Sequence, residues 1–125
     1  MDDKICDAGS CPVVTTLSMI GGKYKALILW HLLDHTRRFG ELRRLIPQAT
    51  AKMLTQQLRE LETAGFLTRT VYPVVPPKVE YSLTDLGQSF RSVLHPIYNW
   101  GERYMNAQGI KIDCDMAIRK PLSST

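Results

Sequence analysis

Residues 50–65 read TAKMLTQQLRELETAG, and they have the pattern of one amphipathic helix. The apolar residues recur three or four positions apart, which places them along one side of a helix. They are Ala51, Leu54, Leu58 and Leu61. Thr50 is a suitable N-cap, because its hydroxyl can accept a hydrogen bond from a backbone N–H of the first turn. Gly65 is the residue type that commonly ends a helix in the left-handed conformation, so the stretch predicts a complete helix.

The opposite side of this helix is polar, and its first half has no acidic residue. It carries Lys52, Thr55, Gln56 and Arg59, with Gln57 at its border. Side chains of these types bind phosphates and base edges in the major groove of DNA. The acidic residues, at positions 60 and 62, come near the end of the helix. The pattern is typical of a recognition helix, and the alternative interpretation is an ordinary solvent-exposed face.

The length and composition indicate one globular domain. The chain has 125 residues, of which 44% are hydrophobic and 22% are charged, and these are ordinary proportions for soluble proteins. No apolar run approaches the roughly 18 residues that span a bilayer. The acidic start, MDDKICDAGS, is unlike a secretory signal, so we expect a cytoplasmic protein with no membrane partner. We expect a flexible arm over 1–10, a core with dimerisation helices over 11–108, and a partly disordered tail over 109–125.

Positive charge is concentrated around the predicted recognition helix. Residues 23–78 hold ten Lys and Arg against four Asp and Glu, a net charge of +6. Because the whole chain has a net charge of +4, the remainder has a net charge of −2. This distribution favours a polyanionic partner such as DNA.

The three cysteines do not form a metal or disulfide pattern. Cys6, Cys11 and Cys114 are odd in number and lack the His or Cys pairs of a zinc site. No Ser/His/Asp set, carboxylate pair or phosphate-binding glycine loop is present. We therefore expect no metal, no cofactor and no enzymatic activity.

Helices are also predicted before the recognition helix, over 11–20, 23–33 and about 39–46. The second should be buried through Leu27, Ile28, Trp30 and Leu32, with Lys23 and Lys25 at its start as phosphate-binding candidates. A short turn over 36–38 leads to the third, which Pro47 ends. Two short helices joined by about three residues form a helix-turn-helix.

Two strands are predicted after the recognition helix, over 66–72 and 78–83. In the second, Val79, Tyr81 and Leu83 alternate as in a half-buried strand. The loop between the strands contains Pro73, Pro76 and Pro77, which cannot donate hydrogen bonds to a sheet. A helix-turn-helix followed by a hairpin predicts a winged helix-turn-helix fold, mainly α with a small β-hairpin as the wing.

A last helix is predicted from Thr84, its N-cap, to about Gln108, with a kink at Pro96. Its apolar residues are Leu86, Phe90, Val93, Leu94, Ile97, Trp100, Tyr104 and Met105. A domain of this size has no core deep enough for all of them. We therefore expect the N- and C-terminal helices to form a homodimer interface. In the alternative, the first helix and the tail cover this stripe within one chain.

These residues resemble the HxlR family of bacterial winged-helix regulators, also described as MarR-like. The matching segments are CP at 11–12, IGGKYK at 20–25, RRFGELRRLIP at 37–47, KMLTQQLRELE at 52–62, GFLTR at 65–69, VPPKVEYSLTDLG at 75–87 and W at 100. The resemblance implies a homodimer that binds double-stranded operator DNA with the helix at 50–64 and the flanking minor groove with the wing. Tyr24 stands where the family usually has Trp, and Gln48-Ala49-Thr50 replaces a commoner Gly-Ile-Ser.

For a DNA-binding protein of this kind, the residue types predict individual contacts. Gln56 and Gln57 can pair with adenine, Arg59 with guanine or phosphate, and Met53 and Thr55 can contact a thymine methyl group. The candidates for phosphate contacts are Lys52, Arg38, Arg43 and Arg44, and Lys78 is the candidate contact of the wing. For each cation the alternative is ordinary surface charge, and for Lys78 it is protection of an edge strand.

Cys11 is the candidate redox-sensing residue. The resemblance implies this role, because some family members sense quinones, aldehydes or hypochlorite through a cysteine at this Cys-Pro position. A thiol at the start of a helix is also more readily ionised and more reactive. Cys6 and Cys114 are possible resolving thiols. The alternative is that Cys11 is a small apolar core residue.

Two other functions remain open at this point. One is a DNA-binding regulator controlled by a non-covalent small molecule in a pocket between the N- and C-terminal helices. Aromatic residues for such a pocket are Trp30, Tyr98, Trp100 and Tyr104. The other is a winged-helix protein-interaction module, against which the basic central span argues.

Overall fold

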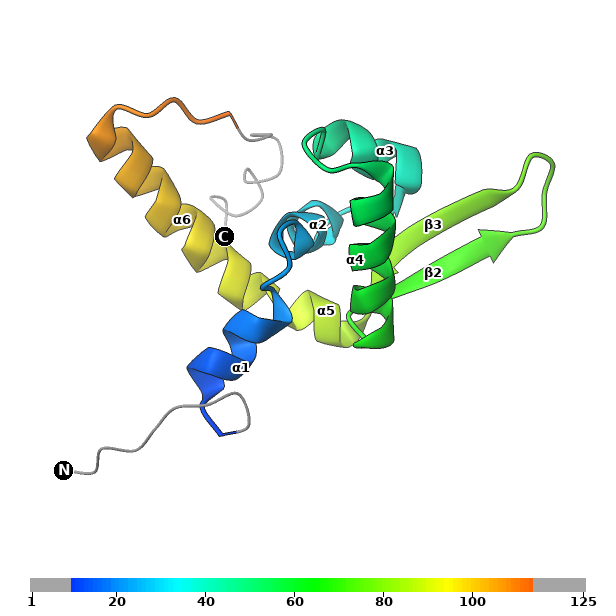
Figure 1. The fold of residues 1–125 in the computed structure, drawn as a ribbon, viewed down its shortest axis with the longest axis horizontal. Helices are drawn as coiled ribbons and strands as arrows, with labels where there is room; N and C mark the ends of the chain where they lie inside the picture. Colours follow the sequence, from blue (N-terminus) through cyan, green and yellow to red (C-terminus); the bar gives the residue numbers. More distant parts are fainter. Residues whose placement is uncertain (1–9, 114–125) are drawn as a thin grey trace.

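The helices and strands follow the order predicted for a winged helix-turn-helix. The computed structural model describes residues 10–113. Its elements are α1 (Pro12–Met19), α2 (Lys25–Leu32), β1 (Arg37–Arg38), α3 (Phe39–Leu45), α4 (Ala51–Thr63), β2 (Leu67–Tyr72), β3 (Lys78–Leu83), α5 (Asp85–Ser89) and α6 (Arg91–Gln108). Figure 1 shows α3 and α4 around α2, the β2–β3 hairpin projecting on one side, and α1 and α6 on the other. The predictions for the arm before residue 10, the tail beyond residue 113, Cys6 and Cys114 lie outside the described residues.

Both predicted caps of α4 are confirmed. The hydroxyl of Thr50 accepts a hydrogen bond from the backbone N–H of Met53 at 3.1 Å, and Gly65 has a φ of 89°. Leu54, Leu58 and Leu61 are buried as predicted. The placement of Ala51 on the apolar side was wrong, because this first residue of α4 is exposed beside Lys52 and Thr55.

The core forms around α2, which contacts α3, α4 and α6. Ile28, Leu29 and Leu32 are completely or almost completely buried, together with Trp30. The prediction that Leu27 is buried was wrong. Its side chain is 38% exposed, because it borders the cavities between α2 and α6 instead of packing against α4.

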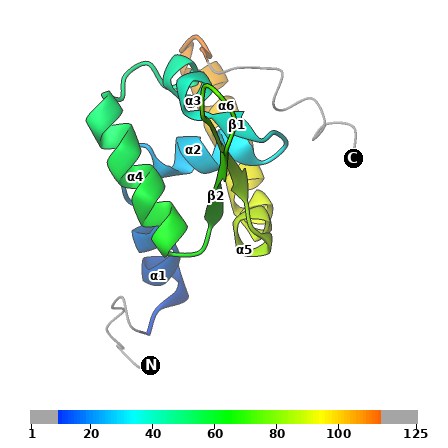
Figure 2. The ribbon, with the colours of Figure 1, turned by 90° about the vertical axis from the view of Figure 1, so that its right-hand side faces the viewer.

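The sheet has the strand order β1-β3-β2, with both pairs antiparallel. In the wing, Leu67 is opposite Leu83 and Tyr72 is opposite Lys78, so the predicted hairpin is confirmed. Figure 2 views the molecule from the side of the wing, with α4 on one side of the hairpin and α5 and α6 on the other. The turn predicted over 36–38 contains a strand, β1, which pairs with β3. Two residues are too few to show a strand pattern in the sequence.

The last helix is divided at a different place from the one predicted. The break is at Phe90, between α5 and α6, and α6 continues through Pro96. Gly87 packs so closely on the chain just before strand β2 that a Cβ there would overlap the carbonyl oxygen of Phe66. The Phe90 ring is buried against the Phe66 ring at a centroid distance of 5.2 Å, so this contact fixes the position of the break. The predicted N-cap is confirmed, because the Thr84 hydroxyl accepts a hydrogen bond from the N–H of Gly87 at 3.1 Å.

Helices α1 and α6 expose an apolar surface. None of the residues of α1 is buried, and α6 buries only Leu94 fully. We call the following exposed residues the α1/α6 surface: Val13, Leu17, Met19, Ile97, Trp100 and Tyr104. Among residues 10–113, no helix is both long and apolar enough to cross a membrane.

Candidate nucleic-acid interface

Four of the predicted DNA-binding residues form one exposed face on α4. Lys52, Thr55, Gln56 and Arg59 line a shallow surface hollow together with Ala51, and we call these four the recognition face. The i to i+3 and i+4 spacing brings their side chains to the same side of the helix. Two cations, a hydroxyl and an amide are therefore presented together, as contacts with phosphates and base edges require.

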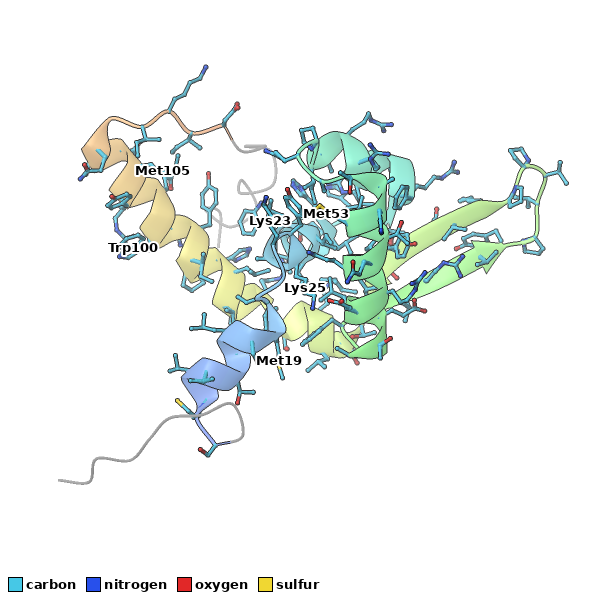
Figure 3. All side chains as sticks on the ribbon, viewed as in Figure 1. Met19, Lys23, Lys25, Met53, Trp100 and Met105 are labelled. Atoms are coloured by element: carbon cyan, nitrogen blue, oxygen red, sulfur yellow. The ribbon has the colours of Figure 1, made fainter. Side chains whose placement is uncertain are left out.

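Two other predicted residues of α4 turn away from this face. Met53 and Gln57 are half-buried, and Met53 packs against the core (Figure 3). The side-chain oxygen of Gln57 accepts a hydrogen bond from the backbone N–H of Tyr24 at 2.8 Å. Tyr24 is itself buried, and its hydroxyl donates to the carbonyl oxygen of Gln48 at 3.2 Å. Tyr24, which stands where the family usually has Trp, therefore packs within the core. Its hydroxyl joins the start of α2 to the turn of the helix-turn-helix.

Lys25, a phosphate-binding candidate from the sequence, forms an ion pair instead. Its Nζ lies 2.7 Å from a carboxylate oxygen of Glu60 on α4. Gln56 donates from Nε2 to the other Glu60 oxygen at 3.3 Å. The hydrogen bond from Lys25, and then that from Gln56, lowers the pKa of Glu60. Lys23, by contrast, is exposed, with its ammonium 5.4 Å from the centre of the Tyr24 ring.

The arginines around α3 have different surroundings. Arg43 and Arg44 are exposed on α3, and no ion pair is recorded for either within residues 10–113. Arg38 is also exposed, and its backbone N–H donates to Glu41 at 2.7 Å. Arg37 is held in place, because its Nε donates to the carbonyl oxygen of His31 at 2.9 Å. The structure thus leaves Arg38, Arg43 and Arg44 accessible to a phosphate.

The wing presents an apolar tip and, directly after it at the start of β3, a cation. Val75 is completely exposed in the uncharged loop 73–77. Lys78 is half-buried, with its Nζ 3.2 Å from Glu80 and 4.8 Å from the centre of the Tyr72 ring. Arg69 on β2 is a further exposed cation that the sequence motifs did not single out, although its place in the polar segment TRT was a signal.

Cys11 is the N-cap residue of α1 and is half-buried. Its backbone carbonyl accepts the first hydrogen bond of the helix, from Thr15 at 2.9 Å. The thiol is thus placed at the start of α1, as the sequence predicted.

A cavity of about 350 Å³ lies between α2, the α3–α4 turn and α6. Its lining includes Leu27, His31, Leu45, Tyr98, Glu102 and Met105. Of the four aromatic residues suggested for a pocket, Tyr98 lines this cavity. Trp30 lines a smaller one, and Trp100 and Tyr104 stack on each other on the α1/α6 surface at a centroid distance of 5.3 Å (Figure 3).

Comparisons with known proteins agree with this geometry. Residues 19–109 match the family model of the HxlR-like helix-turn-helix proteins. YdeP of Bacillus subtilis (strain 168), named an uncharacterized HTH-type transcriptional regulator, is 50% identical over 114 residues, which cover 91% of this chain and 86% of YdeP.

Two solved structures of the redox regulator HypR are similar to this chain. The oxidised form has a TM-score of 0.71 at 49% identity, and the match covers 74% of this chain and 96% of HypR. The reduced form has a TM-score of 0.74 at 46% identity, with coverage of 78% and 97%. The family model and the relatives describe transcriptional regulators and not enzymes. This protein belongs to the HxlR-like helix-turn-helix family of transcriptional regulators, for which DNA is the expected partner.

Proposed function

We propose that the protein binds a pseudo-palindromic operator as a homodimer and that modification of Cys11 switches this binding. The observation that carries the proposal is the recognition face of α4, which presents Lys52, Thr55, Gln56 and Arg59 together. In a helix-turn-helix, the second helix enters the major groove. Here α4 is that helix, and its exposed side has the required side chains.

The contacts divide into those that position the protein and those that read the bases. Gln56 is the best placed residue for a base edge, because its amide is exposed at the middle of the recognition face. Lys52, Arg59 and the α3 arginines Arg43 and Arg44 are assigned to phosphates or, for Arg59, to guanine. Each phosphate contact adds to the salt dependence of binding, so the affinity should fall steeply with salt concentration.

The α1/α6 surface supports the homodimer. Trp100 is 61% exposed and Val13 is 65% exposed, and exposed apolar side chains in such number indicate an interaction surface. The surface lies on the side of the molecule away from the wing (Figure 1). A second copy bound there would leave α4 and the wing of both subunits accessible to DNA, related by a two-fold axis as a palindromic operator requires.

The proposed switch rests on the position of Cys11 at the start of α1 and on the relatives. HypR is described as a redox regulator in oxidised and reduced forms. In this chain, the Cys11 thiolate would either add to an electrophile, forming a C–S bond, or form a disulfide. For the disulfide, two thiols lose two electrons and two protons to an oxidant such as diamide, whose N=N bond is reduced to a hydrazine. Cys6 or Cys114 would supply the second thiol, within one chain or between subunits. Either product would displace α1 and change the separation of the two recognition helices.

The test of DNA binding is fluorescence anisotropy with duplex from the protein's own upstream region, compared with random duplex over a range of salt concentrations. Lys52→Ala should reduce the slope of log affinity against log salt by about one. Lys111→Ala is the matched control, since Lys111 is exposed beyond α6 and away from the recognition face. Equal affinity for both duplexes, followed by failure of a random-site selection, would exclude sequence-specific binding.

The switch is tested by the same titration before and after diamide treatment. The wild type should lose affinity on oxidation and recover it with a thiol reductant, whereas Cys11→Ser should bind DNA and not respond. A Cys11→Ser protein that responds as the wild type does would rule out this residue as the sensor.

The dimer is tested by light scattering after size-exclusion chromatography. Trp100→Glu should reduce the mass to that of one chain, because it would bury a charge in the interface. Val75→Glu places the same charge on the exposed wing tip and should leave the mass unchanged. A wild-type mass of one chain at every concentration would contradict the homodimer.

A second mode of control is supported by the 350 Å³ cavity, which is of the size that binds small molecules. A ligand between α2 and α6 would alter the angle between the DNA-binding helices and α6. Specific DNA binding that is unaffected by oxidants or electrophiles would favour this non-covalent control over Cys11.

A further inference from the structure

We propose that Glu60 is a positioning residue for base recognition. It is held by Lys25 of α2, and it orients the Gln56 amide so that Gln56 selects adenine in the major groove. The inference rests on the proposed sequence-specific DNA binding. It assigns a role to an acidic residue that does not itself face a base.

The first step is the anchoring of Glu60. One of its carboxylate oxygens lies 2.7 Å from the Nζ of Lys25, which comes from the first turn of α2. The Lys25 side chain is largely buried, at 16% exposure, so the ammonium group has few other positions. The carboxylate is ionised at neutral pH, because the ordinary pKa of a glutamate is 4.5 and the hydrogen bond from Lys25 lowers it further.

The second step follows from the chemistry of an ionised carboxylate, which can only accept hydrogen bonds. The group of Gln56 that contacts Glu60 must therefore be the NH₂ group, and its Nε2 lies 3.3 Å from Glu60 Oε2. The side-chain oxygen Oε1 of Gln56 is then on the side of the amide away from Glu60. A glutamine without this partner could present either end of its amide to the DNA.

The third step is the match to a base. With one N–H directed to Glu60, Gln56 has one N–H and the oxygen Oε1 available to DNA. In the major groove adenine offers the N7 acceptor and the N6 amino donor, which these two groups complement. Guanine offers two acceptors, N7 and O6, and would leave Oε1 without a donor. The oriented amide therefore favours adenine over guanine.

Two contacts hold α4 against the start of α2. Gln57, the neighbour of Gln56, accepts a hydrogen bond from the backbone N–H of Tyr24 at 2.8 Å. Lys25 and Tyr24 are adjacent, so the start of α2 is joined to α4 at two consecutive residues. The two glutamines thus differ in role, since Gln57 fixes α4 to α2 and Gln56 is available to DNA.

The experiment measures the ratio of affinities for two duplexes that differ by adenine or guanine at the base that Gln56 contacts. That base is identified by random-site selection with the wild type and with Gln56→Ala, which should lose the preference at one position of each half-site. Glu60→Ala and Lys25→Met should each lower the adenine-to-guanine ratio by about twofold, the effect expected of one such side-chain pair on a helix. Glu62→Ala is the matched control, since it removes the same charge from the same helix at an exposed position that does not contact Lys25 or Gln56.

A double-mutant cycle separates positioning from a general structural effect. If Glu60 acts through Gln56, Glu60→Ala should not change the ratio further in a Gln56→Ala background. Loss of stability would lower the affinity for both duplexes and would not change their ratio. A ratio in Glu60→Ala and Lys25→Met equal to that of Glu62→Ala would overturn the inference, with the proposed function intact. Absence of specific binding by the wild type would instead refute the proposed function and the inference with it.

Discussion

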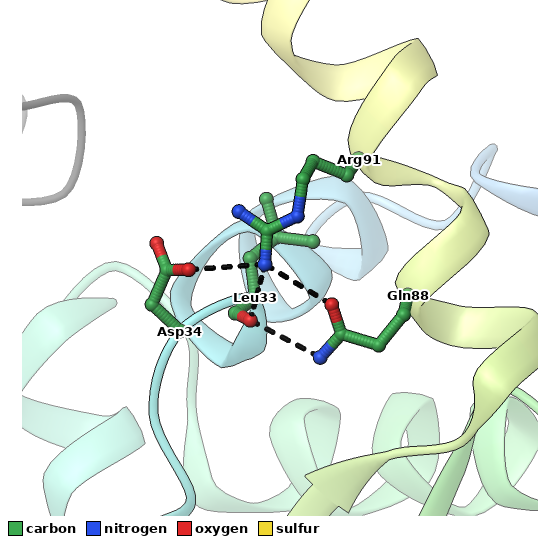
Figure 4. A network of polar contacts seen from close by, with 4 residues as sticks. All are labelled: Leu33, Asp34, Gln88 and Arg91. Atoms are coloured by element: carbon green, nitrogen blue, oxygen red, sulfur yellow. Dashed lines mark hydrogen bonds and ion pairs between the residues drawn. The ribbon is translucent and has the colours of Figure 1, made fainter. Parts of the chain in front are cut away.

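A guanidinium nitrogen of Arg91 lies 2.8 Å from the backbone carbonyl oxygen of Leu33 and donates a hydrogen bond to it (Figure 4). The same nitrogen lies 3.0 Å from a carboxylate oxygen of Asp34 and 3.1 Å from the side-chain oxygen of Gln88. Gln88 also donates to the Leu33 carbonyl at 3.1 Å. The C-terminus of α2 is thereby capped by side chains of α5 and α6, which joins the DNA-binding helices to the helix of the α1/α6 surface.

Arg91→Ala should destabilise the protein by about 1 kcal/mol, because it removes a hydrogen bond to a helix-terminal carbonyl and a partly exposed ion pair. The free energy of unfolding is measured by denaturant titration at fixed protein concentration. Arg103→Ala, at an exposed position of the same helix, is the control and should change it by less than about 0.5 kcal/mol. Equal values for the two variants would show that the network in Figure 4 does not stabilise the fold.

Gln57→Ala should cost about 1 to 2 kcal/mol of stability, because the half-buried N–H of Tyr24 loses its acceptor. Gln56→Ala should leave stability within about 0.5 kcal/mol of the wild type, because Gln56 is exposed. DNA selectivity should show the reverse order, with the larger loss in Gln56→Ala. Thermal unfolding measures the stability of the two variants, and the anisotropy titration measures their DNA selectivity. A Gln57→Ala protein as stable as Gln56→Ala would disprove the assignment.

Gly87→Ala should destabilise the fold by about 3 kcal/mol or more, or prevent folding, because the added Cβ would overlap the Phe66 carbonyl oxygen. Gly40→Ala is the comparison within α3, where a Cβ would meet no other atom within 4 Å. This second variant should be as stable as the wild type or more stable by about 0.5 to 1 kcal/mol, since alanine favours a helix over glycine. Circular dichroism during thermal unfolding measures both, and tolerance of Gly87→Ala would contradict a close contact between Gly87 and the Phe66 carbonyl.

Stability should fall in mild acid because of His95. Burial lowers the pKa of His95, the positive charge of Arg91 lowers it further, and Asp34 acts in the opposite direction. Because the native pKa is below the unfolded value of 6.5, the unfolded chain binds more protons between these two values. The contribution to stability is therefore complete above the unfolded pKa and is lost as the pH falls from that value through the native pKa.

The measurement is the free energy of unfolding of the wild type and His95→Gln between about pH 7.5 and 5. The variant should show the weaker pH dependence. His35→Gln, which alters an exposed histidine, should follow the wild type. A wild type with no more pH dependence than His95→Gln would contradict the prediction.

The local elements of this fold were predictable because their signals are short-range. Thr50 and Gly65 mark the ends of α4 through hydrogen bonds and backbone angles of neighbouring residues. The alternation of Val79, Tyr81 and Leu83 likewise determined the face of β3 that packs on the core. The recognition face followed from helical periodicity alone.

The partners of individual side chains were not predictable, because they come from distant segments. Gln56 and Gln57 are identical neighbours, and only the contact of Gln57 with Tyr24, 33 residues earlier, distinguishes them. The ion pair of Lys25 with Glu60 and the hydrogen bond of Arg91 to Leu33 are likewise contacts between separate helices.

The sequence by itself determined the order of helices α1 to α4 and of the two wing strands, the caps of α4 and the residue types offered to DNA, since these depend on spacing and on local hydrogen bonding. Only the tertiary structure decided that the last helix breaks at Phe90 and not at Pro96. The burial of Phe90 against Phe66 and the close approach of Gly87 to the Phe66 carbonyl outweigh one missing helical hydrogen bond. The tertiary structure also decided which polar residues remain accessible, because packing α2 against α4 engages Lys25 and Gln57 and leaves Lys52, Thr55, Gln56 and Arg59 at the surface.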